Sequence, residues 1–211
     1  MPDYMILIRE NETEQQRMAP ADEHLVHRIQ RSANRMTRMI SQILDFARIR
    51  SGQSFDLRIE SADLRHICQN VIDEFRFSKP GQEITLRIEG QTDVLMDSDR
   101  ISQLLSNLIS NAIQHGTREP IDVSVHETGP NAVAIEVHNV GPAIPKAAQP
   151  HLFEAFYRGT AAGNHQSSIG LGLFIANEIV RAHGGSIAVR SPDRNGTTFS
   201  VVLPRRCEAA A

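Results

Sequence analysis

The feature that most constrains the fold is an apolar helix near the middle of the chain that carries two amide side chains. The sequence SNLISNAIQHG, residues 106–116, places Asn107 and Asn111 four residues apart. Residues at this spacing project from one face of a helix, one turn apart. An amide in a helix interior competes with the backbone for hydrogen bonds and adds nothing to helix propensity. The placement therefore indicates that these two amides hold something.

The chemistry of the pair fits a metal bound by phosphates. An amide oxygen is a hard, neutral ligand, which suits Mg²⁺ that is held mostly by phosphates and water. Taken alone, the pair is more simply interpreted as surface or core-edge amides. The sequence contains no GxxxxGK[ST] stretch, which excludes a Walker-type phosphate site.

Composition excludes several classes of protein. The 211 residues are 40% hydrophobic and 22% charged, which are ordinary globular values. A formal net charge of −3 argues against a dedicated nucleic-acid binder. Cys68 and Cys207 form no CxxC pair, and the nine histidines show no metal-binding spacing. No segment reaches the roughly 18 consecutive apolar residues that span a bilayer, so we expect a soluble, cytoplasmic chain without a membrane segment.

The first part of the chain is predicted to hold one long helix. Residues 1–22 are uneven and mostly polar, and we interpret them as a loosely specified arm. In residues 23–54 the apolar residues Ile29, Met36 and Ile43 recur every seven positions. A repeat of this length is typical of helices that pair with one another.

A second set of positions fills the alternate row of the same heptads. It consists of Leu25, Ser32, Met39 and Phe46. Because both rows persist along the helix, the pattern favours a homodimer or heterodimer formed through residues 23–51. The alternative is a single amphipathic helix packed on its own domain.

The rest of the chain alternates helix and strand patterns. Helices are predicted from about Asp63 to the break at Lys79, from Ser98 as N-cap to Gly116, and over residues 170–185. Strands are predicted within residues 55–62 and at 82–90, 93–97, 121–129, 131–141, 186–191 and 197–204. Residues 146–169 are small and polar in part, and we expect a mobile loop there. The order predicts an α+β fold, a two-layer α/β sandwich with helices on one face of a mixed sheet, over residues 55–206, with 207–211 as a tail.

Three further motifs are weak when taken singly. Gly170 and Gly172 open a helix, and small residues there let backbone N–H groups reach an anion at the helix N-terminus. Asn139 ends a strand just before a Gly-Pro turn, which by itself is an ordinary strand end. Three aromatic residues lie between the turn and the glycines: Phe153, Phe156 and Tyr157. Aromatic residues in such a stretch more often belong to the hydrophobic core than to a functional site.

The order of these motifs resembles that of the ATP-binding catalytic domain of the sensor histidine kinases. NLISNA, LFEAFYRG and GLGLFIANEIVRAHGG are similar to the N box, the F box and the second glycine box of that family. The stretch EVHNVGPAIP is similar to its first glycine box. The resemblance covers residues 55–206 and implies the ATP-binding sandwich shared with gyrase, Hsp90 and MutL. The helix before it resembles the second helix of the family's dimerisation domain.

The resemblance implies a role for each matched residue, with ATP and Mg²⁺ as cofactors. Asn111 matches the Mg²⁺ ligand, and Asn107 the neighbouring amide that contacts metal or phosphate. Asn139 stands where the family usually has an aspartate that accepts a hydrogen bond from the adenine amino group. The implied ATP site also includes His115, Gly141, Ile144, Phe153, Gly170, Leu171, Gly172, Leu173 and Thr198, with Thr197 as the alternative to Thr198.

The sequence departs from the family pattern in three ways. With Asn139, a hydrogen bond of about 1.5–3 kcal/mol becomes one of about 0.5–1.5 kcal/mol, so we expect nucleotide binding to be weaker by about tenfold. Gln114 stands where a lysine often approaches the phosphates, a loss that His115 would offset only in part. The sequence has no His-(Glu/Asp)-x-(Arg/Lys)-x-Pro stretch, and His24 and His27 lack the acidic follower and the proline. We therefore expect the phosphoacceptor on another segment or another chain.

Three functions follow from this pattern. The favoured one is an ATP-dependent protein-histidine kinase module that transfers the γ-phosphoryl group of Mg·ATP to a histidine, with a response regulator receiver domain as partner. The second is a pseudokinase that binds nucleotide and dimerises with kinases; Asn139, Gln114 and the missing acceptor favour it. The pair Asn107 and Asn111, together with Gly170 and Gly172, favours the enzyme. The third is an ATPase clamp or anti-sigma kinase, against which the F box and the heptad helix argue.

Overall fold

The computed structural model describes residues 20–52, 55–158, 169–192 and 195–207. The predicted arm, except for its last residues, and the predicted tail at 208–211 lie outside this part. The side chains of His24 and His27 also lie outside it, although their backbone belongs to a helix.

Helix α2 (Pro20–Arg50) crosses the boundary between two compact units, residues 1–43 and 44–211. Three heptad positions that the structure describes are each at least half exposed: Ile29, Met36 and Ile43. This stripe is an exposed apolar surface on the single chain. Across the described residues, every helix is too short or too polar to cross a membrane.

The second unit begins at residue 44, earlier than the predicted domain start at residue 55. The reason is that the last turn of α2 packs against it. The buried Asp45 accepts hydrogen bonds from Arg100 Nη1 at 3.2 Å and from Gln103 Nε2 at 2.7 Å. Two apolar residues of the same turn pack on the core, Phe46 and Ile49.

A five-stranded mixed sheet forms one layer of this unit. Its order is β2 (Ile84–Glu89), β4 (Ile121–Glu127), β5 (Ala132–Asn139), β7 (Thr197–Pro204) and β6 (Ser186–Arg190). The pair β2 and β4 is parallel, and the other neighbours are antiparallel. A separate antiparallel pair joins β1 (Glu60–Asp63) to β3 (Asp93–Met96). The mixed sheet agrees with the prediction.

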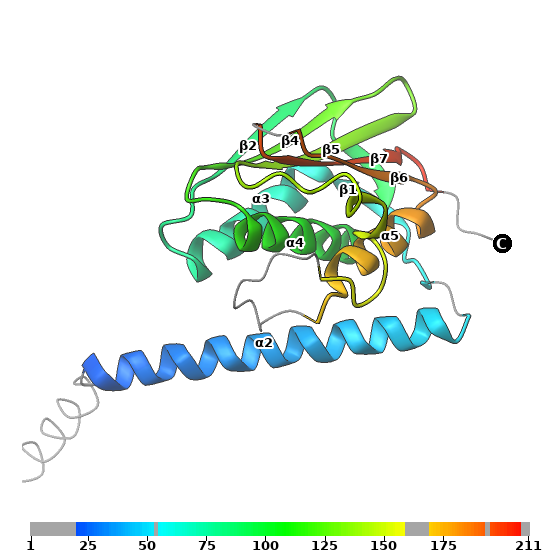
Figure 1. Ribbon diagram of the computed structural model, residues 1–211. Coiled ribbons are helices and arrows are strands. Elements are labelled where there is room, and N and C mark those ends of the chain that lie inside the picture. Colours follow the sequence, from blue (N-terminus) through cyan, green and yellow to red (C-terminus); the bar gives the residue numbers. More distant parts are fainter. Residues whose placement is uncertain (1–19, 53–54, 159–168, 193–194, 208–211) are drawn as a thin grey trace, which may run out of the picture. The chain divides into compact units, whose positions relative to one another are not determined.

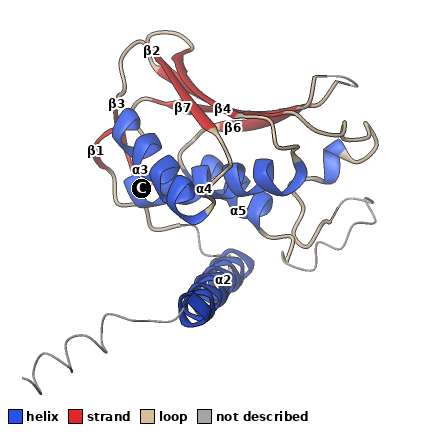
Figure 2. Cartoon of the chain, turned by 90° about the vertical axis from the view of Figure 1, so that its left-hand side faces the viewer, coloured by secondary structure: helices blue, strands red, loops and turns tan. Residues whose placement is uncertain are grey.

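Helices α3 (Leu64–Ser78), α4 (Ser98–His115) and α5 (Gly172–Ala182) form the second layer, on one face of the sheet (Figures 1 and 2). The strands turn alternate residues toward them, as the period of two requires. In β5 and β7 these inward residues are Val133, Ile135, Val137, Phe199, Val201 and Leu203. The predicted two-layer α+β sandwich is confirmed.

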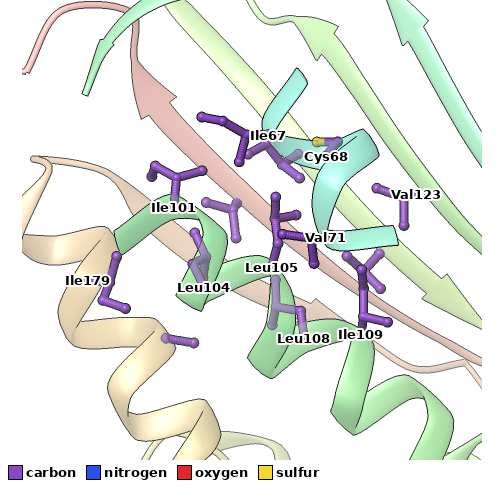
Figure 3. Packing of buried hydrophobic residues seen from close by; sticks show 14 of the residues in the cluster. Ile67, Cys68, Val71, Ile101, Leu104, Leu105, Leu108, Ile109, Val123 and Ile179 are labelled. Carbon is purple, nitrogen blue, oxygen red and sulfur yellow. The ribbon is translucent and has the colours of Figure 1, made fainter. Parts of the chain in front are cut away.

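Helix α4 lies at the centre of the core. Its buried side chains recur at helical spacing and form one stripe: Ile101, Leu104, Leu105, Leu108, Ile109 and Ala112. Figure 3 shows the larger ones directed at apolar residues of α3, α5 and β4. The stripe fixes which side of the helix faces the core.

The N-cap of α4 is Asp97. The prediction of Ser98 as the N-cap is therefore wrong by one residue. Asp97 has an extended backbone (φ −83°, ψ 105°), and its Oδ1 accepts from Arg100 N at 3.0 Å. Its Oδ2 accepts from Arg58 N at 2.9 Å, so one carboxylate also holds the chain before β1. Gly116 ends the helix as predicted.

The predicted loop over residues 146–169 is ordered in part. Ala148 is buried, and a short 3₁₀ helix, η1, follows at Gln149–His151. Phe153 packs against the core. Residues 159–168, which hold the small polar stretch that suggested the loop, lie outside the described part.

His183 joins the end of α5 to the start of α4. Its ring is buried; Nδ1 donates to Ile179 O at 2.8 Å, and Nε2 accepts from Asp97 N at 3.2 Å. This pattern requires the neutral imidazole. Burial lowers the pKa of His183, and the bond to Ile179 and the charge of Asp97 oppose that shift only in part.

The free energy of unfolding should therefore depend on pH through His183. In the unfolded chain the imidazole takes up a proton as pH falls through about 6.5, whereas the folded chain resists it. Stability from this group is complete above pH 6.5 and declines below it. Denaturant titrations between about pH 7 and pH 5 should show a smaller decline for His183→Gln than for the unchanged chain.

The exposed His66 on α3 offers a matched control. His66→Gln should keep the steeper decline of the unchanged chain. If His183→Gln and His66→Gln give the same slope, His183 does not carry the pH dependence.

Candidate functional site

The candidate site lies where the carboxyl ends of α4 and β5 meet the amino end of β7. Three glycines allow the backbone segments to pack closely around Asn139: Gly116, Gly141 and Gly196. A Cβ atom at Gly116 would lie 2.5 Å from Ala112 O and 3.1 Å from Asn139 Nδ2, and one at Gly141 would lie 2.8 Å from His115 O and 3.2 Å from Asn139 Nδ2. A Cβ atom at Gly196, where φ is +71°, would collide with Asn139 O. The backbone can close around Asn139 because all three positions lack a side chain.

Asn139 is a buried amide at the last position of β5. It is 4% exposed, and its Nδ2 donates to Val140 O at 3.4 Å. This orientation makes Oδ1 the atom that can accept a hydrogen bond from a ligand. Asn139 lies directly opposite Thr197 in the antiparallel pair of β5 and β7. Both residues belong to the set that faces the helices, together with Val137 and Phe199.

The register places the two candidate threonines on opposite faces of the sheet. Thr198 is paired with His138, one position along, and its hydroxyl lies 2.9 Å from His138 Nδ1. That places Thr198 on the opposite face of the sheet, in a shallow hollow that Arg87, Asp122 and Glu136 also line. Thr198, the predicted site residue, therefore points away from Asn139. The structure brings Thr197, the alternative, to the side of Asn139.

Asn107 and Asn111 are both half-buried on α4, at the edge of its apolar stripe. The Nδ2 atom of Asn107 is buried. The pair is therefore neither fully exposed nor in the core. No group of three or more His, Cys, Asp or Glu side chains in the described part could hold a metal ion. The neutral oxygens of these amides fit an ion that takes most of its ligands from a bound phosphate chain.

The glycines that open α5 are held against the aromatic segment. Gly170 has φ +79°, and its carbonyl accepts from Phe156 N at 2.9 Å. A Cβ atom there would lie 2.9 Å from Tyr157 O. The following Leu171 is buried and provides no side-chain cap for α5, which begins at Gly172. The backbone N–H groups of the first turn lack a side-chain cap, as an anion-binding helix end requires.

The aromatic residues divide between core and surface. Phe153 packs on the core, with its ring 6.3 Å from that of Phe199. Phe156 is 54% exposed, has φ +65°, and places its ring 4.9 Å from that of Phe46. The simpler expectation, that these aromatics are core residues, holds for Phe153 and not for Phe156.

The remaining predicted site residues lie on α4, on α5 and in the segment after β5. His115 is exposed at the end of α4, and Leu173 is half-buried in the first turn of α5. Ile144 is half-buried, and both polar atoms of its backbone are hydrogen-bonded to side chains. Its N–H donates to Ser191 Oγ at 2.9 Å, and its carbonyl accepts from Gln149 Nε2 at 3.0 Å.

Sequence reasoning missed Ser191 and Gln149. Ser191 is buried just after β6, and its hydroxyl also lies 2.8 Å from that of Thr197. The only signal for Ser191 was its place between a strand and the Gly-Thr-Thr turn. Gln149 lay inside the segment that we expected to be a mobile loop.

Two family descriptions match the sequence. "Histidine kinase-, DNA gyrase B-, and HSP90-like ATPase" matches residues 96–206, and "His Kinase A (phospho-acceptor) domain" matches residues 6–52. The second match conflicts in part with the expectation that the acceptor region is missing. It extends to residues 6–22, which were interpreted as an arm, although the sequence lacks the expected His-(Glu/Asp)-x-(Arg/Lys)-x-Pro stretch.

Individual relatives agree with these matches. The sensor histidine kinase TrcS of Mycobacterium tuberculosis is 34% identical over 193 residues, which cover 89% of this chain and 37% of TrcS. The catalytic domain of histidine kinase ThkA is 27% identical with a TM-score of 0.60, covering 71% of this chain and 97% of that one. The Acinetobacter baumannii histidine kinase AdeS shares the fold, with 21% identity and a TM-score of 0.69 over 97% of this chain and 95% of that one.

The chain spans 24–38% of the length of the first three curated relatives. Within that span the match to the ATPase family alone covers more than half of the chain, and the His Kinase A match precedes it. The chain therefore belongs to the histidine kinase-, DNA gyrase B- and HSP90-like ATPase family, as a member of the sensor histidine kinases.

Proposed function

We propose that this chain is the ATP-binding, phosphoryl-transferring module of a sensor histidine kinase, acting on a histidine. The observation that carries the proposal is the closure of Gly116, Gly141 and Gly196 around the buried Asn139. This closure places an amide acceptor, a threonine hydroxyl and the amide-bearing helix α4 around one junction. Such a set suits a purine nucleotide with a metal-bound phosphate chain.

The phosphate side of the site would use α4 and α5. Asn111 Oδ1 would hold Mg²⁺, and Asn107 would contact the metal or a phosphate oxygen. Bound Mg²⁺ supplies charge neutralisation to the phosphates during transfer. The uncapped first turn of α5, beginning at Gly172, would donate backbone N–H groups to phosphate oxygens.

The base side would use the ends of β5 and β7. Asn139 Oδ1 would accept from the adenine amino group, and Thr197 would support the same edge of the base directly or through water. Gly141 and Ile144 would border the base, because they belong to the segment that follows Asn139 directly.

The partners of this module are also part of the proposal. The match to the phospho-acceptor domain and the open apolar stripe on α2 support a homodimer or heterodimer through residues 23–51. A response regulator receiver domain would take the phosphoryl group from the histidine. Because the substrate is ATP, we place the module in the cytoplasm.

The alternative is a pseudokinase that binds nucleotide and regulates a partner kinase. Asn139, Gln114 and the lack of the expected acceptor stretch favour it. Incubation of the full chain with Mg²⁺ and γ-labelled ATP separates the two, with and without an acceptor helix from another kinase. Acid-labile, base-stable label on either protein supports the kinase. No label on either, with ATP binding intact, supports the pseudokinase.

The metal assignment predicts the effect of Asn111→Ala. Removing the only side-chain oxygen of this position should abolish Mg²⁺-dependent ATP binding in calorimetric titration, while the thermal unfolding temperature changes little because Asn111 is only half-buried. The matched control is Asn70→Ala, the same change at an exposed position of α3, which should bind as the unchanged chain does. Unchanged binding by Asn111→Ala would refute the metal assignment.

The adenine assignment predicts the effect of Asn139→Asp. A charged acceptor should tighten nucleotide binding by about tenfold. A carboxylate at this buried position should also lower the thermal stability of the nucleotide-free chain. Its charge is removed from water, which costs free energy, and it has no N–H group to donate to Val140 O. Fluorescent-nucleotide titration and thermal unfolding test the two effects. Weaker binding than that of the unchanged chain would mean that adenine is held elsewhere.

A further inference from the structure

The segment after Asn139 has little regular structure of its own, yet it borders the candidate base pocket. Residues 140–148 contain neither helix nor strand. A segment without its own backbone ladder keeps its shape only if other groups satisfy its N–H and C=O groups. The side chains that do so for Ile144 are those of Ser191, 47 residues away, and Gln149, five residues away.

Ser191 and Gln149 hold the Ile144 backbone from both sides. Ser191 Oγ accepts from Ile144 N at 2.9 Å, and Gln149 Nε2 donates to Ile144 O at 3.0 Å. Both distances are those of well-formed hydrogen bonds. Ser191 follows β6, whereas Gln149 begins η1 five residues after Ile144, so the loop is held both by the sheet and by its own continuation.

The same serine also contacts β7. Its hydroxyl lies 2.8 Å from that of Thr197, and both side chains are buried. A serine hydroxyl has one hydrogen and two acceptor positions, so it can accept from Ile144 and still bond with Thr197. Ser191 therefore links the segment after Asn139 to the threonine opposite Asn139.

We propose that Ser191 and Gln149 are positioning residues of the base pocket, which fix Ile144 and Thr197 relative to Asn139. This inference rests on the proposed function, because it assumes that adenine binds at this junction. Neither residue needs to touch the nucleotide. Their effect should be confined to the base side, since the side-chain hydrogen bonds of Ser191 and Gln149 reach Ile144, Gly196 and Thr197.

The test compares a ligand that has a base with one that has none. Binding of Mg·ATP and of Mg·tripolyphosphate to the full chain is measured by displacement of a fluorescent ATP analogue. Ser191→Ala should weaken ATP binding by about threefold to tenfold, the value of one hydrogen bond, and leave tripolyphosphate binding unchanged. Gln149→Ala should show the same pattern, and it remains available if Ser191→Ala does not fold.

Two further variants define what the result means. Ser191→Thr keeps the hydroxyl and should restore ATP binding. Ser200→Ala removes a hydroxyl on β7 that donates to Glu136 on the other face of the sheet at 2.7 Å, and it should leave both ligands unaffected.

The outcomes separate this inference from the proposed function. The positioning role is refuted if Ser191→Ala and Gln149→Ala weaken the binding of ATP and of tripolyphosphate equally, or if they change the binding of neither. ATP binding by the unchanged chain still stands in both cases. If the unchanged chain does not bind ATP, the proposed function itself fails, and the inference fails with it.

Discussion

Burial of one face of α4 is the constraint on which the rest of the structure depends. Five large side chains of this face are almost completely buried: Ile101, Leu104, Leu105, Leu108 and Ile109. Burial of each is worth about 1.5–3 kcal/mol, which far exceeds what two amides at the edge can gain or lose by rotation of the helix. The stripe therefore fixes the rotation, and helical spacing then brings Asn107 and Asn111 to the same edge. The packing of the core therefore determines where the two amides of the proposed site lie.

The second constraint is the register of β5 and β7. Side chains alternate across a sheet, so a shift of one residue moves every side chain to the other face. The pairing of Asn139 with Thr197 places both on the helix side, and Thr198 must then face away. The glycine at 196 makes this register compatible with the close approach of Asn139, because any side chain there would meet the Asn139 carbonyl. Strand pairing and glycine position together determine which threonine lies beside Asn139.

Sequence patterns predicted what depends on local periodicity, and missed what depends on tertiary contacts. The helix 98–116, the alternating strands and the spacing of Asn107 and Asn111 follow from periods of 3.6 and 2. Asp97 and Ser98 are both good N-cap residues, and only the backbone conformation decides between them. Thr198 was chosen over Thr197 because register is not visible in one strand. The sequence composition near Gln149 suggested a loop, but the bond to Ile144 orders that part of it.

Because Asn139 is neutral, the arrangement of the groups around it is important in the proposed site. A charged hydrogen bond is worth about 1.5–3 kcal/mol, and a neutral one about 0.5–1.5 kcal/mol. In the proposed site, recognition of adenine through the amide of Asn139 would draw on several neutral bonds, each of which weakens steeply with poor angle or distance. Groups that only align others then gain influence over affinity. The clamp on Ile144 and the contact of Ser191 with Thr197 lie beside Asn139, where such alignment would have the greatest effect in the proposed site.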